Sequence, residues 1–594
     1  MNHIVLAGFH TVLALQGGPA SVTGVIRDAD AGSVISGAIV SLPELNRTTA
    51  SDADGRYTIA AVPAGPHHIS VRKIGYAART LHAFVPVSGT LEINVSILLL
   101  PVAERLATVV VRRPVEVGRS SGGDAISPAD ETTSIAAIRN NPLLTQPDVL
   151  QSLSGGEISV KHEAPGGVHI RGGASDHTSY VLDGIPVFSP YHTAGIFGAW
   201  NPDALSHVAV TSAMPSFAHP GTLSGTIAAV TRNSGPRLST RGSISSTHTG
   251  VTLDGPLGIG DAAFLASVRF AYPHLTAWTD DPTYVQGASG DRLLKLDIPA
   301  IGGQLKLVGY HSTNEISTAS ETDAEAGGGA VRGRNTFEWQ SQSLGFAWSR
   351  AFSTTRVNLI GWSAAIDAES RWKGRMSPLV MTAGRFEQGA VLLAVKTFAR
   401  STVTAGGRFE SNRNSYVVRF DSGALAQFRI AGRQPLVAAF TNYSAAIGNR
   451  AHVDFGSSAA LAGGAIRLSP QAQLRWTHSD RLASSAGFAR THQFSQSLRN
   501  PESVTAGIFP ADLFAGAGPA AFPVARSDLG VVSATYRPTA DTRIAVQAWE
   551  RRFNNLLLVA PFDDEPFATR PIGFGGGRAR GASAEASVGS KRYG

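Results

Sequence analysis

The stretch VHIRGGASDHTSYVLDGIPV, residues 168–187, contains two short apolar segments that are each interrupted by turn-forming or charged residues. The interrupting residues are Arg171, Gly172, Gly173, Asp183, Gly184 and Pro186. We interpret the stretch as a short hairpin in which the glycines at 172 and 173 allow positive φ angles and close approach of the backbone. Asp183-Gly184 is a turn signal, and Pro186 stiffens the chain beyond it. A nucleophile, a phosphate-binding loop, a metal site and a structural element are all conceivable here.

The composition is that of a glycine-rich, charge-poor chain. The 594 residues include 64 glycines, and only 16% of them are charged. The length predicts several domains. No apolar run reaches the roughly 18 to 20 residues of a transmembrane helix, so membrane residence would require a β-barrel or surface attachment. The net charge of +7 has no Lys/Arg runs and does not indicate a nucleic-acid partner, and the absence of cysteine excludes disulfides and thiolate metal sites.

Residues 1–20 have an apolar centre followed by small residues, as a signal peptide does, although no basic residue precedes the centre. We therefore expect export, with an ordinary apolar strand or a misassigned start as the alternatives. Residues 104–135 predict an extended segment and then a flexible linker of small polar residues. The G-x-S-x-G match at 118–122 lies in that linker rather than between a strand and a helix, so we treat it as accidental.

Residues 21–103 alternate short β-prone segments with Gly, Pro and Asp turns, which predicts a small β-sandwich. Asp52 and Asp54 lack the further oxygen ligands of a calcium loop, so we interpret them as part of a turn. This unit resembles the carboxypeptidase regulatory-like domain, a non-catalytic appendage. The matching residues are Gly24-Val25-Ile26, Gly37-Ala38, Ser51 to Gly55, Tyr57, Val62 to Gly65 and Gly75-Tyr76.

Residues 136–235 predict a compact α/β unit, in which the apolar spacing over 148–153 suggests one amphipathic helix. Residues 236–594 predict a long series of antiparallel strands. Apolar and aromatic side chains alternate with small or polar ones, for example in 264–272, 344–349 and 471–477. Because the segments are long and aromatics lie near their ends, the pattern favours an outer-membrane barrel with a wet interior over a soluble sandwich.

The order and spacing of four motifs resemble the plug domain of the TonB-dependent outer-membrane receptors. The motifs are Val168 to Gly173, Val181 to Val187, Asn201 to Leu205 and Leu223 to Ile227. The sequence departs from the family where Lys-Gly, Tyr-Gly and Pro-Gly-Val are usual. Those positions are occupied by Thr211-Ser212-Ala213, His219-Pro220-Gly221 and Ser154-Gly155-Gly156. The departures concern local loop conformation and leave the assignment intact.

The resemblance implies a mainly β protein of the bacterial outer membrane, with an N-terminal sandwich, an α/β plug domain and an antiparallel transmembrane β-barrel. It implies import of a scarce ligand with energy from TonB and its inner-membrane complex, and no catalytic residue, cofactor or metal. Within such a plug, we expect Arg171 to pair with carboxylates of the plug or the barrel wall rather than to bind ligand.

The TonB-binding segment, or TonB box, should be an extended strip that can add to the edge of a partner's sheet. Thr108, Val109, Val110 and Val111 meet this requirement next to the flexible linker. The alternative is that they form the last strand of the sandwich.

Other functions remain open at this stage. The chain could bind or sense a ligand at the outer membrane without transporting it. An enzyme is a more distant alternative, because the sequence has no H-E-x-x-H motif and no P-loop. The ligand is not readable, and a siderophore, cobalamin, an oligosaccharide or a peptide would each fit.

Barrels of this class close with about 22 strands, which leaves roughly 16 residues here for each strand and its loop. That allowance is small, and the last residues, EASVGSKRYG, lack a terminal aromatic strand. We therefore expect the barrel to be C-terminally incomplete.

Overall fold

The computed structural model divides the chain into two compact units, Met1–Pro114 and Val115–Gly594. It describes residues 20–28, 32–45, 47–73, 79–97, 130–139, 147–153, 157–161, 167–192, 197–212, 221–245, 248–271, 286–320, 333–372, 379–420, 426–497, 512–514, 522–539, 542–559 and 572–588. The proposed signal peptide up to residue 19, the segment Thr108 to Val111 and the linker up to residue 129 lie outside these ranges.

The first unit is a sandwich of two four-stranded sheets. Its elements are β1 (Ala20–Asp28), β2 (Ile39–Leu42), the 3-10 turn η1 (Pro43–Leu45), β3 (Arg47–Ala50), β4 (Arg56–Val62), β5 (Gly65–Arg72), β6 (Arg79–Val85), β7 (Thr90–Glu92) and β8 (Val95–Ile97). One sheet has the order β4-β1-β7, with β8 also pairing with β1, and the other has the order β3-β2-β5-β6. Apolar side chains from both sheets, including Val22, Val40 and Ile69, form one buried core.

Two turns explain the local path of the sandwich. Asp52 accepts hydrogen bonds at Oδ1 from the backbone N–H groups of Asp54 (3.0 Å) and Arg56 (2.8 Å), so it stabilises a turn, as predicted. Gly37 has a φ of +63° in a second turn, and β2 begins only beyond it, at Ile39.

The second unit begins with a small mixed domain, residues 130–231, which we call the plug. Its elements are β9 (Asp130–Ser134), α2 (Ile135–Arg139), η2 (Gln151–Leu153), β10 (Ile158–Lys161), β11 (Gly167–Ile170), η3 (Ser175–His177), β12 (Thr178–Leu182), β13 (Ile185–Pro186), β14 (Tyr191–His192), β15 (Phe197–Gly198), η5 (Pro202–Ala204), β16 (Leu205–Thr211) and β17 (Gly225–Thr231). Five strands form a sheet in the order β13-β12-β17-β16-β9, in which only β12 and β17 are parallel.

Two predictions about the plug are wrong in detail. The stretch 168–187 is not one hairpin, because β11 pairs with β10 while β12 pairs with β13 and β17. The amphipathic helix over 148–153 is only the 3-10 turn η2. Asp148 explains the difference, because its buried carboxylate accepts N–H groups from Leu150 (2.9 Å) and Gly198 (2.6 Å) and so ties this segment to β15.

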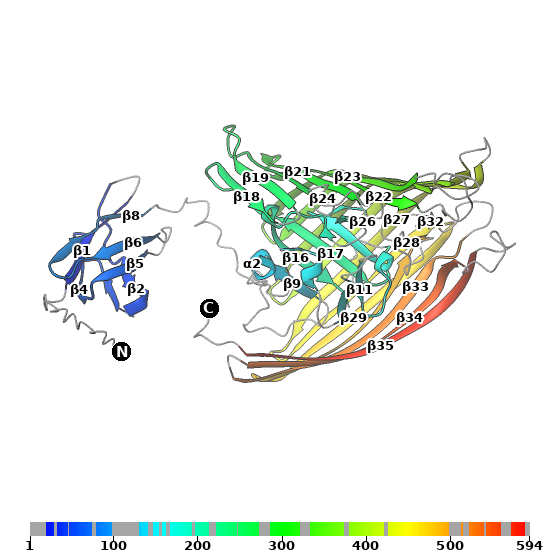
Figure 1. The fold of residues 1–594 in the computed structure, drawn as a ribbon. Coiled ribbons are helices and arrows are strands. Elements are labelled where there is room, and N and C mark those ends of the chain that lie inside the picture. Colours follow the sequence, from blue (N-terminus) through cyan, green and yellow to red (C-terminus); the bar gives the residue numbers. More distant parts are fainter. Residues whose placement is uncertain are drawn as a thin grey trace, which may run out of the picture. The chain divides into compact units, whose positions relative to one another are not determined.

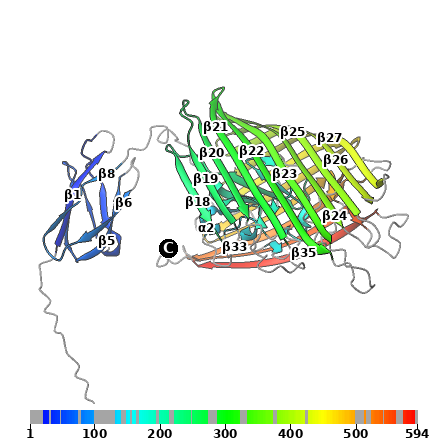
Figure 2. The same cartoon turned by 45° about the horizontal axis from the view of Figure 1, so that its top comes forward.

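The rest of the second unit is one curved antiparallel sheet of 16 strands, which we call the wall (Figures 1 and 2). Its strands are β18 (Ser239–Ile244), β19 (His248–Pro256), β20 (Ala263–Ala271), β21 (Gln286–Ala300), β22 (Gly303–Ser320), β23 (Gly333–Phe352), β24 (Thr355–Trp372), β25 (Leu379–Thr397), β26 (Ser401–Phe420), β27 (Ala426–Ile447), β28 (Ala451–Ala462), β29 (Ala465–Ser479), β30 (Leu482–Gln493), β33 (Ala525–Thr539), β34 (Thr542–Val559) and β35 (Ile572–Val588). The short strands β31 (Ser495–Ser497) and β32 (Asp512–Phe514) pair with each other. The order runs from β18 to β35, and within the described ranges no ladder joins these two strands.

The two rims of the wall differ. One rim carries tight connections such as Ile301-Gly302 and Ser353-Thr354. Longer connections, at 272–285, 321–332 and 560–571, all belong to the opposite rim. We call these the short-turn rim and the loop rim.

The wall exposes apolar side chains and buries polar ones, which is the reverse of the surface of a soluble protein. Along β20, Val268 and Phe270 are exposed, whereas Ser267 and Arg269 are buried. Leu344 on β23 is 65% exposed, whereas the neighbouring Ser343 is 4% exposed. The predicted alternation is therefore confirmed, with apolar side chains outside and polar ones toward the plug. In the described part of the chain, no helix is long and apolar enough to span a membrane.

Candidate functional site

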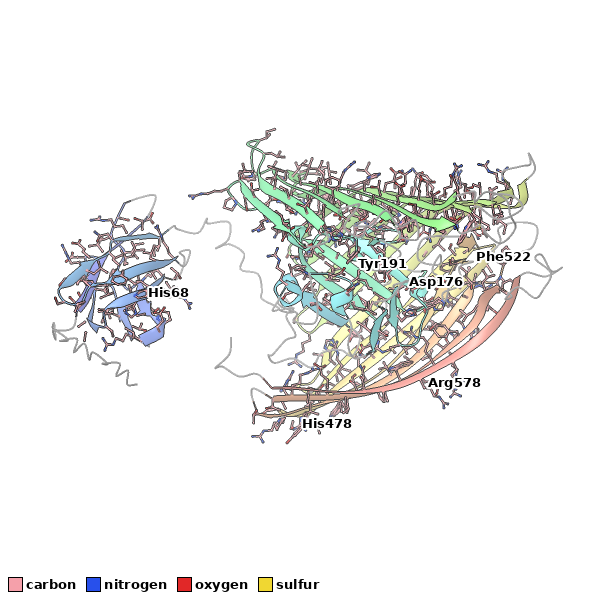
Figure 3. The ribbon with its side chains drawn as sticks, viewed as in Figure 1. His68, Asp176, Tyr191, His478, Phe522 and Arg578 are labelled. Atoms are coloured by element: carbon pink, nitrogen blue, oxygen red, sulfur yellow. The ribbon has the colours of Figure 1, made fainter. Side chains whose placement is uncertain are left out.

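The candidate functional site is the contact between the plug and the concave face of the wall. Figure 1 shows β9, β16 and β17 within the curve formed by the wall strands. Asp176 and Tyr191 of the plug also lie on this inner side, whereas Arg578 of β35 lies on the outer side (Figure 3). Plug and wall share one apolar cluster, which joins Leu182 and Trp200 to Leu265 and Tyr310.

Two tight turns shape the plug surface that meets the wall. Asp183 and Gly184 have φ angles of +51° and +86°, as a type I′ turn between β12 and β13 requires. Arg171 and Gly172 have φ angles of +44° and +72°, and the Gly173 N–H donates to Ile170 O (3.0 Å). The positive φ angles thus fall on Arg171 and Gly172, not on Gly172 and Gly173 as predicted.

Gly173 is instead required by close approach. A Cβ atom there would lie 1.7 Å from Ser224 Oγ, and one at Gly172 would lie 2.4 Å from Cβ of Ala579 on β35. Side chains at these two positions would therefore push the turn away from the rest of the plug and from the wall.

Arg171 is fully buried and connects three parts of the site. Its Nη2 donates to Glu157 Oε1 (2.9 Å) within the plug and to Gln547 Oε1 (3.2 Å) on β34. Nη1 donates to Ser212 Oγ. Gln547 Nε2 also donates to Glu157 Oε2 (2.6 Å), so the three side chains form a closed ring across the contact. Arg171 thus pairs with a carboxylate of the plug, that of Glu157, whereas its partner on the wall is the amide of Gln547.

Arg551, also on β34, is a second buried guanidinium in this region. It donates to three plug carbonyls, those of Ile170 (3.3 Å), Ser212 (3.4 Å) and Ser224 (3.2 Å). No carboxylate in the described ranges pairs with it. Its charge is therefore stabilised by the dipoles of these carbonyls and by the Phe553 ring, whose centre lies 5.9 Å from the guanidinium, and the carbonyl contribution lasts only while the plug stays in place.

Asp183 forms an ion pair between plug and wall. Its Oδ1 lies 3.0 Å from Lys306 Nζ on β22, and its Oδ2 accepts the hydroxyl of Thr231 (2.6 Å). Ser343 on β23 donates to Pro186 O (2.7 Å) just beyond the turn. Asp183 and Pro186 therefore stabilise the plug sheet and also attach it to strands β22 and β23 of the wall.

A third polar contact surrounds His192 on β14. His192 is fully buried, with Nδ1 2.7 Å from Asn314 Oδ1 and Nε2 3.3 Å from Asp291 Oδ2. Arg269 donates to the same Asp291 oxygen (2.9 Å) and to Gly198 O (2.6 Å). Beside this group, burial raises the pKa of Tyr191 well above its ordinary value, and the nearby Tyr180 hydroxyl (2.6 Å) adds to the effect. Tyr191 therefore stays neutral.

Toward the loop rim, the inner wall becomes aromatic. One buried cluster joins Phe337 and Trp339 to the partly buried Trp372 and Tyr416 of the wall and to Phe188 of the plug. The guanidinium of Arg385 lies 4.3 Å from the centre of the Phe188 ring. Arg385 also donates to Glu387 Oε2 (3.0 Å), and its side chain remains 20% exposed near the partly buried rings of this cluster.

The described residues contain no group of three or more His, Asp or Glu side chains that could hold a metal ion. Sequence analysis missed Gln547, Arg551, Lys306 and the His192 network. The one sequence signal for the partners on the wall is the alternation of polar and apolar residues along its strands, which marks the polar positions as facing the interior.

Comparisons with known proteins agree with this architecture. Residues 21–98 match the carboxypeptidase regulatory-like domain family. No curated protein sequence matches the chain significantly. The siderophore receptor PirA from Pseudomonas aeruginosa has a TM-score of 0.56 at 12% identity, over 77% of this chain and 82% of that one.

Two further structures give similar values. The ferric yersiniabactin uptake receptor FyuA from Yersinia pestis has a TM-score of 0.57 at 13% identity, over 79% of this chain and 77% of that one. The copper transporter OprC has a TM-score of 0.56 at 12% identity, over 79% and 78% of the two chains. These likenesses confirm the predicted fold: a carboxypeptidase regulatory-like domain followed by the plug-and-barrel architecture of the TonB-dependent receptors.

Proposed function

We propose that the protein is an outer-membrane receptor that imports a scarce ligand with energy supplied by TonB. The observation that carries this proposal is a wall with apolar side chains outside and buried polar ones inside, whose interior is occupied by the plug with its own five-stranded sheet. An open polar interior would suit passive diffusion. A plug held on the wall by the Asp183–Lys306 ion pair and by buried hydrogen bonds must instead be moved before anything passes, and moving it requires work.

Placement in a membrane is supported by the outer surface. Exposed apolar side chains cover the outward positions of the strands, and Phe352, Phe398, Trp476 and Tyr536 are exposed close to the short-turn rim. Membrane barrels have such an aromatic girdle, and they have short periplasmic turns and longer extracellular loops. We therefore assign the short-turn rim to the periplasm and the loop rim to the outside.

The ligand is proposed to bind on the loop side of the plug, near Phe188 and Arg385. Stacking faces and a guanidinium suit a planar or anionic chelate. The structural neighbours include receptors for siderophores and a copper transporter, which favours a metal chelate over an oligosaccharide or a peptide. Nothing in this arrangement requires a catalytic residue.

TonB is proposed to bind at Thr108 to Val111, ahead of the plug. Since this segment would add as a strand to a partner's sheet, Val110→Pro should remove a backbone donor and stop energised uptake. Ser121→Pro, in the linker, is the matched control and should leave uptake unchanged.

The test measures accumulation of radiolabelled iron, copper and cobalt chelates in cells that carry the chain as their only such receptor. Protonophore-sensitive accumulation that Val110→Pro abolishes and Ser121→Pro retains is the expected result. Normal uptake by Val110→Pro would refute the TonB segment. Binding of a chelate without protonophore-sensitive accumulation would favour the sensing function over transport.

A further inference from the structure

The contact between plug and wall contains a buried positive charge that no described carboxylate balances. Arg171 and Arg551 both donate to Ser212, to its Oγ and its backbone oxygen respectively, so the two guanidinium groups are neighbours. Glu157 pairs with Arg171 (2.9 Å), whereas no carboxylate in the described ranges pairs with Arg551. Because Arg551 is only 1% exposed, bulk water does not screen its charge. A bound anion would therefore be stabilised here.

A small cavity lies beside Arg551, between the plug and the wall strands β30, β33 and β34. Its volume is about 10 Å³, which is room for the centre of one water molecule or one small ion. Leu223 of the plug and Leu529 of the wall form part of its lining, and Ser224 and Arg551 face each other across the junction. A cavity of this size excludes polyatomic anions such as phosphate and sulfate.

Two buried groups at the cavity can donate a hydrogen bond and have no partner among the described residues. They are Nε of Arg551 and Oγ of Ser224, and both residues line the cavity. Ser224 is 2% exposed, and its backbone oxygen already accepts a hydrogen bond from Arg551 Nη2 (3.2 Å). Buried polar groups without partners are costly, so an acceptor bound in the cavity would relieve both of them.

The charge distinguishes an anion from a water molecule as the occupant. A water molecule could accept both hydrogen bonds, but it would leave the charge of Arg551 unbalanced. The Phe553 ring, 5.9 Å from the guanidinium, supplies only a partial negative charge. A chloride ion is spherical, carries one full negative charge and accepts hydrogen bonds from N–H and O–H groups at once. It therefore meets all three conditions: size, charge and hydrogen bonding.

We propose that this cavity binds a chloride-sized monovalent anion, held by Arg551 of the wall and Ser224 of the plug. Each side contributes one donor, so the site is complete only while the plug is in place. Binding of the anion therefore stabilises the seated plug, and movement of the plug releases the anion. This proposal depends on the contact between plug and wall and not on transport.

The test measures hydrogen exchange of plug residues 167–182 in the purified full chain, in detergent with sodium chloride or sodium gluconate at about 200 mM. Gluconate is too large for the cavity and keeps the ionic strength constant. An anion that binds only the seated plug slows exchange through plug release by the factor 1 + [L]/Kd. We expect exchange to be roughly tenfold slower in chloride, as a Kd of about 20 mM gives. Crystals grown in sodium bromide should show anomalous density between Arg551 Nε and Ser224 Oγ.

Ser224→Ala and Arg551→Gln each remove one donor and should reduce the chloride effect to less than about twofold. Ser224→Ala leaves the contacts of Arg551 with the plug carbonyls in place, so it tests the site even where Arg551→Gln loosens the plug. The matched control is Ser370→Ala on β24. Ser370 is also buried, and its hydroxyl also has no partner among the described residues, but it does not line the cavity. This control should keep the wild-type chloride effect.

Equal exchange of the wild type in chloride and gluconate would mean that water fills the cavity, and it would overturn the proposal. An undiminished chloride effect in Ser224→Ala and Arg551→Gln would place the halide elsewhere, and an equal loss in Ser370→Ala would make the effect nonspecific. Either result would overturn the proposal. Bromide density without a halide-dependent exchange rate would indicate an adventitious ion only. A chain that imports its ligand without a chloride effect would refute the anion site alone, and one with the chloride effect but no import would refute transport alone.

Discussion

The N-terminal sandwich and the wall are built from the same alternation of apolar and polar residues but place it in opposite directions. In the sandwich, Val40 and Ile69 are buried between two sheets. In the wall, Leu392 and Phe455 are exposed, while Glu387 and Arg408 are buried toward the interior. A period of two predicts strands in both cases. The side that becomes the core depends on whether water or lipid surrounds the sheet.

The two regions also differ in how their layers are held together. The sandwich relies on apolar packing, which tolerates small shifts at a graded cost. The plug is held on the wall by discrete ionic and hydrogen-bonded contacts such as Asp183–Lys306 and Arg171–Gln547. Contacts of this kind can be lost one at a time, which suits the proposed movement of the plug.

The largest expected effect comes from breaking a charge pair at the plug contact. Glu157→Ala leaves Arg171 buried without its carboxylate and should destabilise the plug by about 3 to 5 kcal/mol. Hydrogen exchange of residues 167–182 measures the loss. The double variant Glu157→Leu/Arg171→Met should recover most of it, because no unpaired charge remains. A single variant with wild-type protection would show that polar contacts do not hold the plug.

The next largest effect compares an exposed apolar residue of the wall with one of the sandwich. Leu392→Arg places a charge on the outward face of the wall and should cost about 2 to 4 kcal/mol in a bilayer. Phe84→Arg, at a residue that is 72% exposed on the sandwich, should change stability by no more than about 0.5 kcal/mol. The free energies of unfolding in lipid vesicles give both values. Equal effects would mean that the wall does not face lipid.

A smaller effect tests tight backbone approach in both regions. Gly24→Ala in the sandwich would bring Cβ to 1.8 Å from the backbone oxygen of Ile93, whereas Gly173→Ala meets the Ser224 hydroxyl. A side chain can rotate more easily than a backbone can move. Gly24→Ala should therefore cost about 1 to 3 kcal/mol, and Gly173→Ala/Ser224→Ala should recover part of the cost of Gly173→Ala. Thermal unfolding followed by hydrogen exchange distinguishes the two regions.

The smallest effect is a pH dependence of the sandwich at high pH. Burial raises the pKa of Tyr57 to about 12, and its hydroxyl donates to Ile93 O (2.8 Å). Because the folded pKa lies above the unfolded one, this stabilisation is complete below pH 10 and is lost as pH rises toward 12. The loss between pH 10 and 11 should be roughly 1 kcal/mol. Hydrogen exchange of residues 20–28 checks this, and Tyr57→Phe should remove the dependence.

Much of the fold could be predicted because it follows from local pattern. The alternation in 264–272 became β20, and Asp183-Gly184 became the tight turn that its composition indicates. The predictions failed where side chains act across the chain. Asp148 holds β15 through Gly198, 50 positions away, and a helix gave way to a 3-10 turn.

The site was predictable only on the plug side. Arg171 was identifiable as a buried pairing residue, but its wall partner Gln547 lies 376 positions away. Lys306 and Asp183 are separated by 123 positions. Such pairs depend on the register of the strands and on how the plug is turned within the wall. A single sequence contains no local signal for either.

Arg551 has a consequence for what could pass once the plug moves. Among the described residues, its hydrogen-bond acceptors are the carbonyl oxygens of Ile170, Ser212 and Ser224, all of which belong to the plug. If the plug moves as proposed and those oxygens withdraw, the Arg551 cation is left on the inner face of the wall with no carboxylate of the described residues paired to it. The opening step would thereby give the conduit a preference for negatively charged cargo, and the cargo would replace the plug as the counter-ion.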